Sequence, residues 1–274
     1  MAKSAIAVLE QGIWQDGAPI RDAELRPITG EDELALAELA LESQAALRTT
    51  ELLTRTVTRI GAQAGPRREA VRALSIGDRE RLLLELYVLS FGASSDLMVT
   101  CPDPGCGEML VIPVDLRDLI QPAAREPTPD HIARLGDAQV RFRLPTGADQ
   151  EVAGALAAAD LEAATDLLLD RCLIEAPPVE RASLRALLAS RLAELDPQAE
   201  ILVDTECPCC GAAASALVDV APLLFARMAS ARGLAAEVDR MARAYHWSEA
   251  DILNLPVGRR KAYLELIATA EPTP

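Results

Sequence analysis

Aromatic and basic residues are scarce in this sequence of 274 residues. Aromatic side chains make up 3% of the chain, and 27 Lys and Arg residues stand against 42 Asp and Glu residues, a formal net charge of −15. Binding to phosphate backbones or anionic lipid needs clustered Lys and Arg, so this balance argues against both. With so few aromatics, Leu, Ala and Val must fill the core, and abundant Ala and Leu favour helix.

A long apolar run and an export signal are missing as well. No stretch has the roughly 18 uninterrupted apolar residues that a membrane span needs. The first residues, MAKSAIAVLEQG, contain one Lys and no apolar segment of signal-peptide length. We therefore expect a soluble, cytoplasmic protein without membrane insertion, in a compartment where paired cysteines favour metal over disulfide.

Familiar catalytic motifs are also lacking. The sequence has no GxSxG, GxxxxGK[ST], GxGxxG or HExxH segment, and its carboxylates form no evident acid–base pair. Its two histidines, His131 and His246, are expected at the surface. We therefore expect no enzymatic activity, no catalytic residue and no small-molecule substrate, and favour a binding, scaffold or assembly protein.

Periodicity and turn signals predict an α+β fold that is mostly helical. Residues 10–28 carry a DG turn between two extended runs. Helical spacing follows over 29–61, 74–92, 146–173 and 183–196, and DLRDLI (115–120) and DVAPLLFARMAS (219–230) are expected to be helical. The expected strands are 96–100, 108–114, 138–145, 200–206 and 212–218. Candidate helix N-caps are Thr29, Ser75 or Asp78, Thr146 and Ser248.

These signals occur twice in the same order. Arg26-x-x-Thr29-Gly30-x-Asp32 has a counterpart in Arg143-x-x-Thr146-Gly147-x-Asp149. Nine residues after a cysteine, each half also carries the aspartate of a Val-Asp pair. We interpret this as a diverged internal duplication, roughly 12–120 and 138–225, with chance recurrence of common signals as the alternative. The predicted organisation is repeat one (1–120), a Pro-rich linker (121–137), repeat two (138–225), a C-terminal helical segment (226–268) and a disordered tail (269–274).

Five of the six cysteines lie in two short segments, CPDPGCG at 101–107 and CPCCG at 207–211. Each segment lies between two expected strands, so each is expected at a hairpin tip. Thiolates at this spacing on tight turns are typical ligands of a structural zinc ion. We predict a zinc ribbon with one structural Zn²⁺ per chain, whose four ligands are Cys101, Cys106, Cys207 and Cys210.

Other interpretations of the cysteines remain open. Cys209 could replace Cys210, although Gly211 favours Cys210, and iron in a rubredoxin-like site uses similar ligands. A redox CxxC would need a strand–helix context, and the expected compartment disfavours a disulfide. Cys172 is expected to be a small buried residue. Four thiolates close the coordination shell, so the predicted site is structural.

The C-terminal segment holds a concentration of aromatic and basic residues. Tyr245, Trp247 and Tyr263 are three of only eight aromatics, and Arg259 and Arg260 lie in the RRKAY cluster. Aromatics and Arg are over-represented among interface anchors, so these five residues are the candidate partner-binding surface. The alternatives are that the aromatics attach the tail helices to their own domain and that RRKAY is a solvated helix end.

The region from ELDPQAEILVDTECPCCG through LPVGRRKAYLELI resembles zinc-knuckle baseplate-associated proteins encoded beside the tail genes of contractile injection systems and contractile-tailed phages. It is similar to the phage base-plate hub and tail-assembly family. The elements that carry the resemblance are Asp196-Pro197, Cys207 with Cys210, Val218-Asp219, Glu237-Val238, Tyr245, Trp247-Ser248-Glu249, Ile252-Leu253, Arg259-Arg260 and Tyr263-Leu264. The match covers about 75 residues and extends more weakly to RLPTGAD, LRPITGEDE and the first knuckle, where the C-x4-C spacing departs from the pattern.

The resemblance implies a non-enzymatic structural or chaperone-like assembly protein whose partners are baseplate and tail proteins of a contractile particle. It would then act in the cytoplasm or inside the assembled particle. The alternative is a zinc-ribbon regulatory or nucleic-acid-associated adaptor, against which the acidic residues flanking the knuckles count: Asp103, Glu108 and Glu206.

Overall fold

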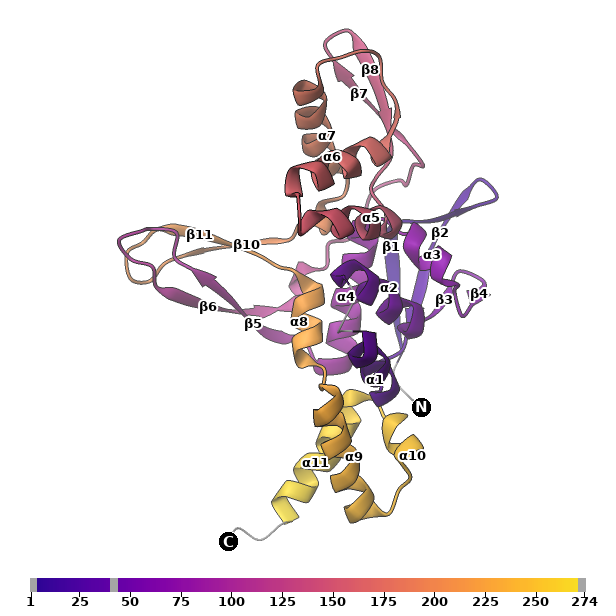
Figure 1. Ribbon diagram of the computed structural model, residues 1–274, viewed down its shortest axis with the longest axis vertical. Helices are drawn as coiled ribbons and strands as arrows, with labels where there is room; N and C mark the ends of the chain where they lie inside the picture. Colours follow the sequence, from indigo (N-terminus) through magenta and orange to yellow (C-terminus); the bar gives the residue numbers. More distant parts are fainter. Residues whose placement is uncertain (1–3, 40–43, 271–274) are drawn as a thin grey trace.

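The computed structural model describes residues 4–39 and 44–270 of the chain. Three parts project from a central body: a long arm of strands, a lobe of strands and helices, and a unit of three helices at the C-terminal end (Figure 1). Helices and strands are intermixed along the chain, which confirms the α+β class. Within the described ranges, no helix is both long and apolar enough to cross a membrane.

The first sheet is antiparallel and has the strand order β1-β2-β3-β4. Its strands are β1 (Ala5–Gln15), β2 (Ala18–Leu25), β3 (Val57–Ile60) and β4 (Gln63–Ala64). The predicted DG turn joins β1 to β2, and both Asp16 (φ 52°) and Gly17 (φ 80°) adopt the left-handed conformation of a tight hairpin. The sequence prediction at this turn is confirmed.

Four helices belong to the central body: α1 (Gly30–Leu39), α2 (Ala45–Thr56), α3 (Arg68–Ala73) and α4 (Ile76–Phe91). Of these, α4 packs against β1 and β2, and α2 packs against β3. The prediction that helical structure runs to residue 61 was wrong, because 57–60 form β3. Val57, Thr58 and Ile60 are β-branched, and Val57 and Ile60 pair with Leu25 and Ala23 of β2; this pairing outweighs the helical spacing that precedes them. As predicted, Ser75 caps α4, its hydroxyl accepting from the Asp78 N–H.

The projecting lobe has its own three-stranded sheet, in the order β7 (His131–Leu135), β8 (Ala138–Phe142), β9 (Leu173–Glu175). The helices that follow its strands are α5 (Gly147–Ala157), α6 (Leu161–Cys172) and α7 (Arg181–Leu195). Thr146 begins α5 with the predicted capping box. The strand–strand–helix–helix–strand order of β1-β2-α1-α2-β3 thus recurs in β7-β8-α5-α6-β9.

Two expectations in this region need correction. The segment 121–137, expected to be a linker, contains β7, which pairs with β8 from His131 to Leu135. His131 was expected at the surface, but its ring is half-buried and lies 5.7 Å from that of Phe142. In the sequence, Ile132 and Leu135 stand among Pro and charged residues, so their alternation was too weak to predict the strand.

The arm consists of two hairpins, β5 (Ser94–Thr100) with β6 (Met109–Asp115) and β10 (Leu202–Glu206) with β11 (Ala213–Leu217). After β6 the predicted helix is only a single 3₁₀ turn, η1 (Leu116–Leu119). It ends three residues before Pro122, because a proline disfavours helical conformation in the residue before it. Before β10 lies η2 (Pro197–Ala199), and after β11 comes α8 (Val220–Arg227).

The C-terminal unit comprises α9 (Ala231–Tyr245), α10 (Glu249–Leu253) and α11 (Val257–Ala270). Ser248 caps α10 as predicted, and Pro256 separates it from α11. Of the tail expected to be disordered, Thr269 and Ala270 belong to α11, and 271–274 lie outside the described residues. The unit has a separate apolar cluster around Met241, Ile252 and Ile267, whereas the main core is built from Leu, Val and Ile of the central body.

Candidate metal centre and helix joints

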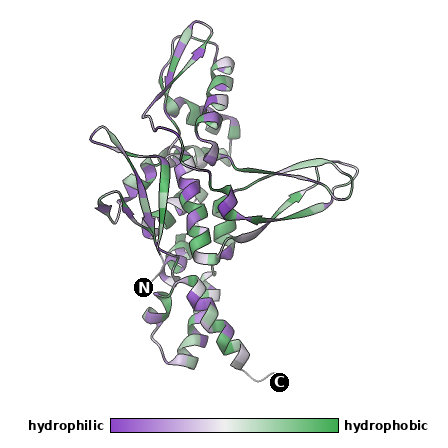
Figure 2. Cartoon of the chain, turned by 180° about the vertical axis from the view of Figure 1, so that it is seen from behind, coloured by the Kyte–Doolittle hydropathy of each residue, from purple (hydrophilic) through white to green (hydrophobic). Residues whose placement is uncertain are grey.

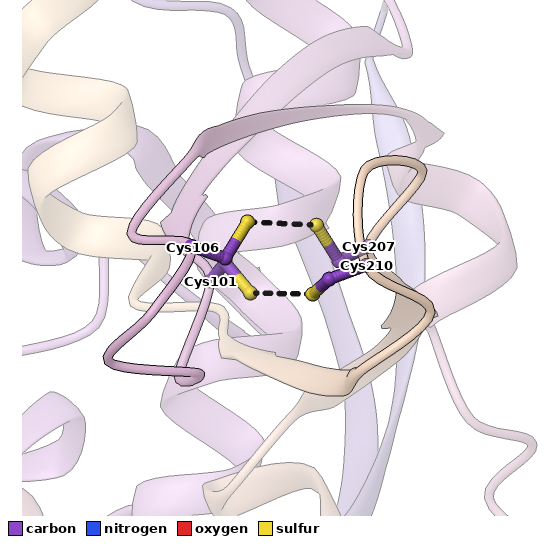
Figure 3. A group of neighbouring side chains, drawn as sticks. All are labelled: Cys101, Cys106, Cys207 and Cys210. Carbon is purple, nitrogen blue, oxygen red and sulfur yellow. Dashed lines mark hydrogen bonds between the residues drawn. The ribbon is translucent and has the colours of Figure 1, made fainter.

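The tips of the two hairpins bring four cysteines together (Figure 3). The Sγ atoms of Cys101, Cys106, Cys207 and Cys210 all lie within 4.8 Å of one another. Across the two hairpins, Cys101 Sγ is 3.6 Å from Cys210 Sγ, and Cys106 Sγ is 3.8 Å from Cys207 Sγ. The structure therefore assembles the four predicted ligands, which are about one hundred residues apart in sequence, into one cluster.

The local backbone explains why each tip holds its pair of cysteines. The N–H of Cys101 donates to Glu108 O, and that of Cys207 donates to Ala212 O, both at 2.8 Å, which closes each hairpin at its first cysteine. Gly107 (φ 60°) and Gly211 (φ 75°) follow the second cysteines in the left-handed conformation. A side chain at either position would be strained, so the glycine in each Cys-Gly pair is required by the turn.

The sulfur geometry fits a metal ion and not a disulfide. Four sulfurs bound at about 2.3 Å to one tetrahedral zinc ion lie about 3.8 Å apart, close to the two distances across the hairpins. A disulfide requires an S–S distance of about 2.05 Å, and all the cysteines are free. The cluster could therefore hold one metal ion with every ligand supplied by the chain.

Hydrogen bonds and burial tune the thiols in opposite directions. The N–H groups of Cys210 and Cys209 point at the sulfur of Cys207 and lower its pKa to about 7. At Cys106 the N–H of Glu108 acts in the same sense, but burial and the neighbouring thiols outweigh it and raise the pKa to about 12. Because metal ligands must be thiolates, a metal ion binding at this cluster would release protons, and its binding would weaken as the pH falls.

The remaining two cysteines lie elsewhere. Cys209 is exposed and is not a member of the cluster, so the second tip contributes Cys210, as Gly211 indicated. Cys172 is fully buried at the end of α6, as predicted, and its carbonyl accepts from Arg143 N.

The repeated Arg-x-x-Thr-Gly-x-Asp motifs form two nearly identical networks. Asp32 accepts two bonds from Arg26, at 2.6 and 3.0 Å, and bonds from the N–H and hydroxyl of Thr29 at 2.9 and 3.0 Å. In the second motif, Asp149 accepts from Arg143 at 2.6 and 3.0 Å and from the N–H and hydroxyl of Thr146, both at 2.9 Å. Burial opposes ionisation of Asp149, but these bonds prevail and lower its pKa to about 2.

The first residues of a distant helix are hydrogen-bonded to each motif. The N–H of Ile76, at the start of α4, donates to Pro145 O, and that of Val257, at the start of α11, donates to Ile28 O. Isolated bridges join Ser75 to Thr146 and Thr29 to Pro256. We call the contacts of the start of α4 with the second motif the α4 joint, and those of the start of α11 with the first motif the α11 joint. Both incoming helices begin with Leu-x-(Ile or Val)-Gly-x-Arg, at 74–79 and 255–260, a recurrence that the sequence analysis missed.

The arginine of that pattern is buried in both joints. Arg79 lies over Gly147, where an added Cβ would be 2.3 Å from its Nη1, and Arg260 lies over Gly30, where the corresponding distance is 3.1 Å. Burial lowers the pKa of Arg79 to about 10. The glycine of each Thr-Gly pair therefore makes room for a guanidinium as well as beginning a helix.

The five residues predicted to bind a partner separate into two groups. Tyr245, Trp247 and Tyr263 are half-buried and pack against one another, with ring centroids 5.0–5.5 Å apart, and the guanidinium of Arg259 lies 5.9 Å from the Tyr263 ring centre. Arg260 is wholly buried in the α11 joint, where it pairs with Glu33 and Glu237. Its guanidinium is therefore not at the surface, where the sequence analysis had expected it.

Comparison with known proteins identifies the family. Residues 15–175 match the family model described as T4 bacteriophage base plate protein. No curated protein and no solved structure matches the chain. The matched segment includes β2, β3 and β4 of the first sheet, the first cysteine pair and both Arg-x-x-Thr-Gly-x-Asp motifs. Because it spans more than half of the chain, this protein belongs to the T4 bacteriophage base plate protein family.

Proposed function

We propose that the chain is a non-enzymatic structural or chaperone-like assembly protein for the baseplate or tail of a phage-like contractile injection system, stabilised by one structural zinc ion. The observation that carries the proposal is membership of a base plate family combined with a cluster of four thiols that leaves no open metal position. A metal ion whose coordination shell is closed serves to hold chain segments together. The binding partners of the protein would be other baseplate or tail proteins.

Zinc is the metal we propose because four thiolates in a tetrahedron on two hairpin tips are its usual structural environment. Cys101 and Cys106 would supply two ligands from the first hairpin, and Cys207 and Cys210 two from the second. Bound there, the ion would fix the two tips to each other at the end of the arm, within a small apolar cluster that is separate from the main core.

We also infer that the two halves arose by duplication. The support is the matching hydrogen-bond networks of Arg26 with Asp32 and Arg143 with Asp149, together with the recurring order of elements. The zinc ion would then join repeat one to repeat two, since each repeat provides one hairpin of the arm.

Metal analysis of purified protein tests the zinc proposal. We expect about one zinc per chain in the wild type, none in Cys106→Ser, and an unchanged content in the matched control Cys209→Ser, whose thiol lies outside the cluster. Because the metal would close a loop of about one hundred residues, its loss should cost about 4–5 kcal/mol of unfolding free energy. Iron in place of zinc, or full metal content in Cys106→Ser, would contradict the proposal.

Deletion of the gene tests the assembly role. We expect the host system to produce no contractile particles, or particles lacking a complete baseplate, and to be restored by the wild-type chain. Intact, active particles in the deletion strain would refute an essential role in assembly. Mass spectrometry of purified particles then shows whether the protein stays in the particle or acts only while it is built.

A further inference from the structure

The arm has an inner and an outer side because side chains alternate along each strand. Leu97 and Leu110 of the first hairpin and Ala214 and Ala216 of the second are buried. The strand β11 lies against β5, so the inner faces pack together: Leu110 and Ala214 lie beside the cysteines, and Leu97 and Ala216 belong to the main core. The outer face of each hairpin consists of the alternate residues.

Exposed apolar side chains occupy the middle of the outer face of the first hairpin. Met98 is 74% exposed, Met109 56% and Val111 59%. Met98 and Val111 are direct partners across the hairpin, and Met109 lies two residues before Val111, so all three are on the same side. We call these three residues the methionine face. Figure 2 shows the hydrophobic character along this projecting arm.

Such a face is unusual for a solvent-exposed hairpin. Antiparallel strands with one buried face normally direct polar residues outward, and contiguous exposed apolar side chains commonly mark interaction sites. Methionine suits this role because its flexible, polarizable side chain adapts to an opposing surface. The proposed zinc ion would hold the face in one conformation before binding, which reduces the entropy lost on docking.

The charge of the arm indicates what kind of surface fits the methionine face. The two hairpins, residues 94–115 and 202–217, contain no Lys and no Arg. They contain six acidic residues: Asp96, Asp103, Glu108, Asp115, Asp204 and Glu206. Asp96 lies on the outer side two residues before Met98, and Glu108 directly precedes Met109. A second copy of this chain would bring like charges together, whereas a basic rim on the partner would pair with them.

We propose that the methionine face docks onto another baseplate protein, on an apolar patch rimmed by Lys and Arg. This inference rests on the proposed function, and it names a surface distinct from the C-terminal aromatic cluster. The apolar side chains provide the contact area, and the acidic rim orients the partner and makes association sensitive to salt.

The test uses the full-length chain and the baseplate proteins encoded beside it, purified one at a time as probes. Met98→Ser/Met109→Ser/Val111→Thr removes the face without touching the inner core, and Ile132→Ser/Leu161→Ser is the matched control at exposed apolar positions outside the arm. Metal content and thermal stability should be unchanged in both variants. We expect the triple variant to weaken binding by about 100-fold, the control to bind like the wild type, and raised salt to weaken the wild-type complex.

Oxidation by peroxide provides a second readout in the same complex. In the free chain, Met98 and Met109 should form sulfoxide readily, whereas the fully buried Met241 should not. In the complex we expect Met98 and Met109 to be protected several-fold. Equal oxidation of both in the free and bound chain would overturn the proposal.

The binding outcomes separate this inference from the function on which it rests. Wild-type affinity in the triple variant, salt-independent binding or dimerisation through the methionine face would each reject the inference, while leaving a baseplate role intact. If none of the baseplate proteins binds the wild-type chain, both the inference and the proposed function fail.

Discussion

Replacing Arg260 by methionine tests the α11 joint at its centre. The guanidinium of Arg260 is fully buried, donates to Glu237 at 2.7 Å through Nε and contacts the carboxylate of Glu33, which is also fully buried. Methionine keeps an unbranched apolar side chain in the space but removes the positive charge. The variant therefore leaves the Glu33 carboxylate inside the protein without its cation.

Removing one partner of a buried ion pair costs about 3–5 kcal/mol, because the remaining charge is desolvated and uncompensated. Two features place this site near the lower end of that range. Glu33 still accepts the N–H of Ala229 at 2.8 Å, and the side chain of Glu237 is 24% exposed and can be hydrated. We therefore expect Arg260→Met to lower the free energy of unfolding by about 3 kcal/mol at pH 7.

Urea denaturation monitored by circular dichroism measures this loss, and hydrogen exchange of the α11 amides shows whether the joint opens first. The matched control is Arg259→Met, the same substitution at the preceding, exposed position, which should change stability by less than about 0.5 kcal/mol. Arg260→Met combined with Glu33→Gln should recover most of the loss, because no buried charge is left unpaired.

The destabilisation caused by Arg260→Met should depend on pH through the ionisation of Glu33. Burial raises the pKa of Glu33, and the charge of Arg260 opposes that rise. Without Arg260 the folded-state pKa rises further above the unfolded value of about 4.3, so the penalty is full at high pH and shrinks as the pH falls through the folded pKa. A loss below about 1 kcal/mol at pH 7, or a loss independent of pH, would refute this account of the joint.

Two further predictions concern α4. In Gly77→Ala the new Cβ would lie 1.8 Å from Asp196 Oδ1, and the hydrogen bond from the Gly77 N–H to Asp196 would be disturbed. We therefore expect the free energy of unfolding in urea to fall by about 2–4 kcal/mol. In the control Gly258→Ala the atom nearest to the new Cβ is 3.3 Å away, so the loss should be much smaller, and equal losses would contradict the packing argument. Burial raises the pKa of Glu80 to about 7, above its unfolded value, so its carboxylate destabilises the fold at pH 8 and this penalty fades as the pH falls toward 5. Glu80→Gln should therefore gain about 1 kcal/mol at pH 8 and nothing at pH 5, as measured on metal-saturated protein; a gain that grows with acidity would show that the sign is wrong.

The sequence predicted those features whose cause is local. Asp16-Gly17 forms its turn because the two residues tolerate positive φ, and Ser75, Thr146 and Ser248 begin helices because their hydroxyl groups lie beside free N–H groups. Gly211 indicated Cys210 as a ligand for the same kind of reason, since glycine tolerates the left-handed turn after the second cysteine. The clustering of the cysteines followed from the recurrence of their flanking residues and from metal chemistry.

Other features depend on which distant segment covers a residue, and a single sequence does not record that. Residues 57–60 continue a helical pattern but become a strand because β2 offers them an edge. From the sequence Arg260 was expected at the surface, but in the fold it is buried against Glu33 of α1. Met98 belongs to a strand of ordinary sequence, and its exposure became evident only because the second hairpin covers the opposite face.

For this protein, then, composition, caps, turns and cysteine spacing predicted most of the helices, most of the strands, the α+β class and the candidate metal ligands, because the signal for each lies within a short segment of sequence. Only the tertiary structure decided that two arginines are buried at matching joints and that one face of the arm remains apolar and uncovered. Those outcomes depend on burial, and burial is a property of the whole folded chain.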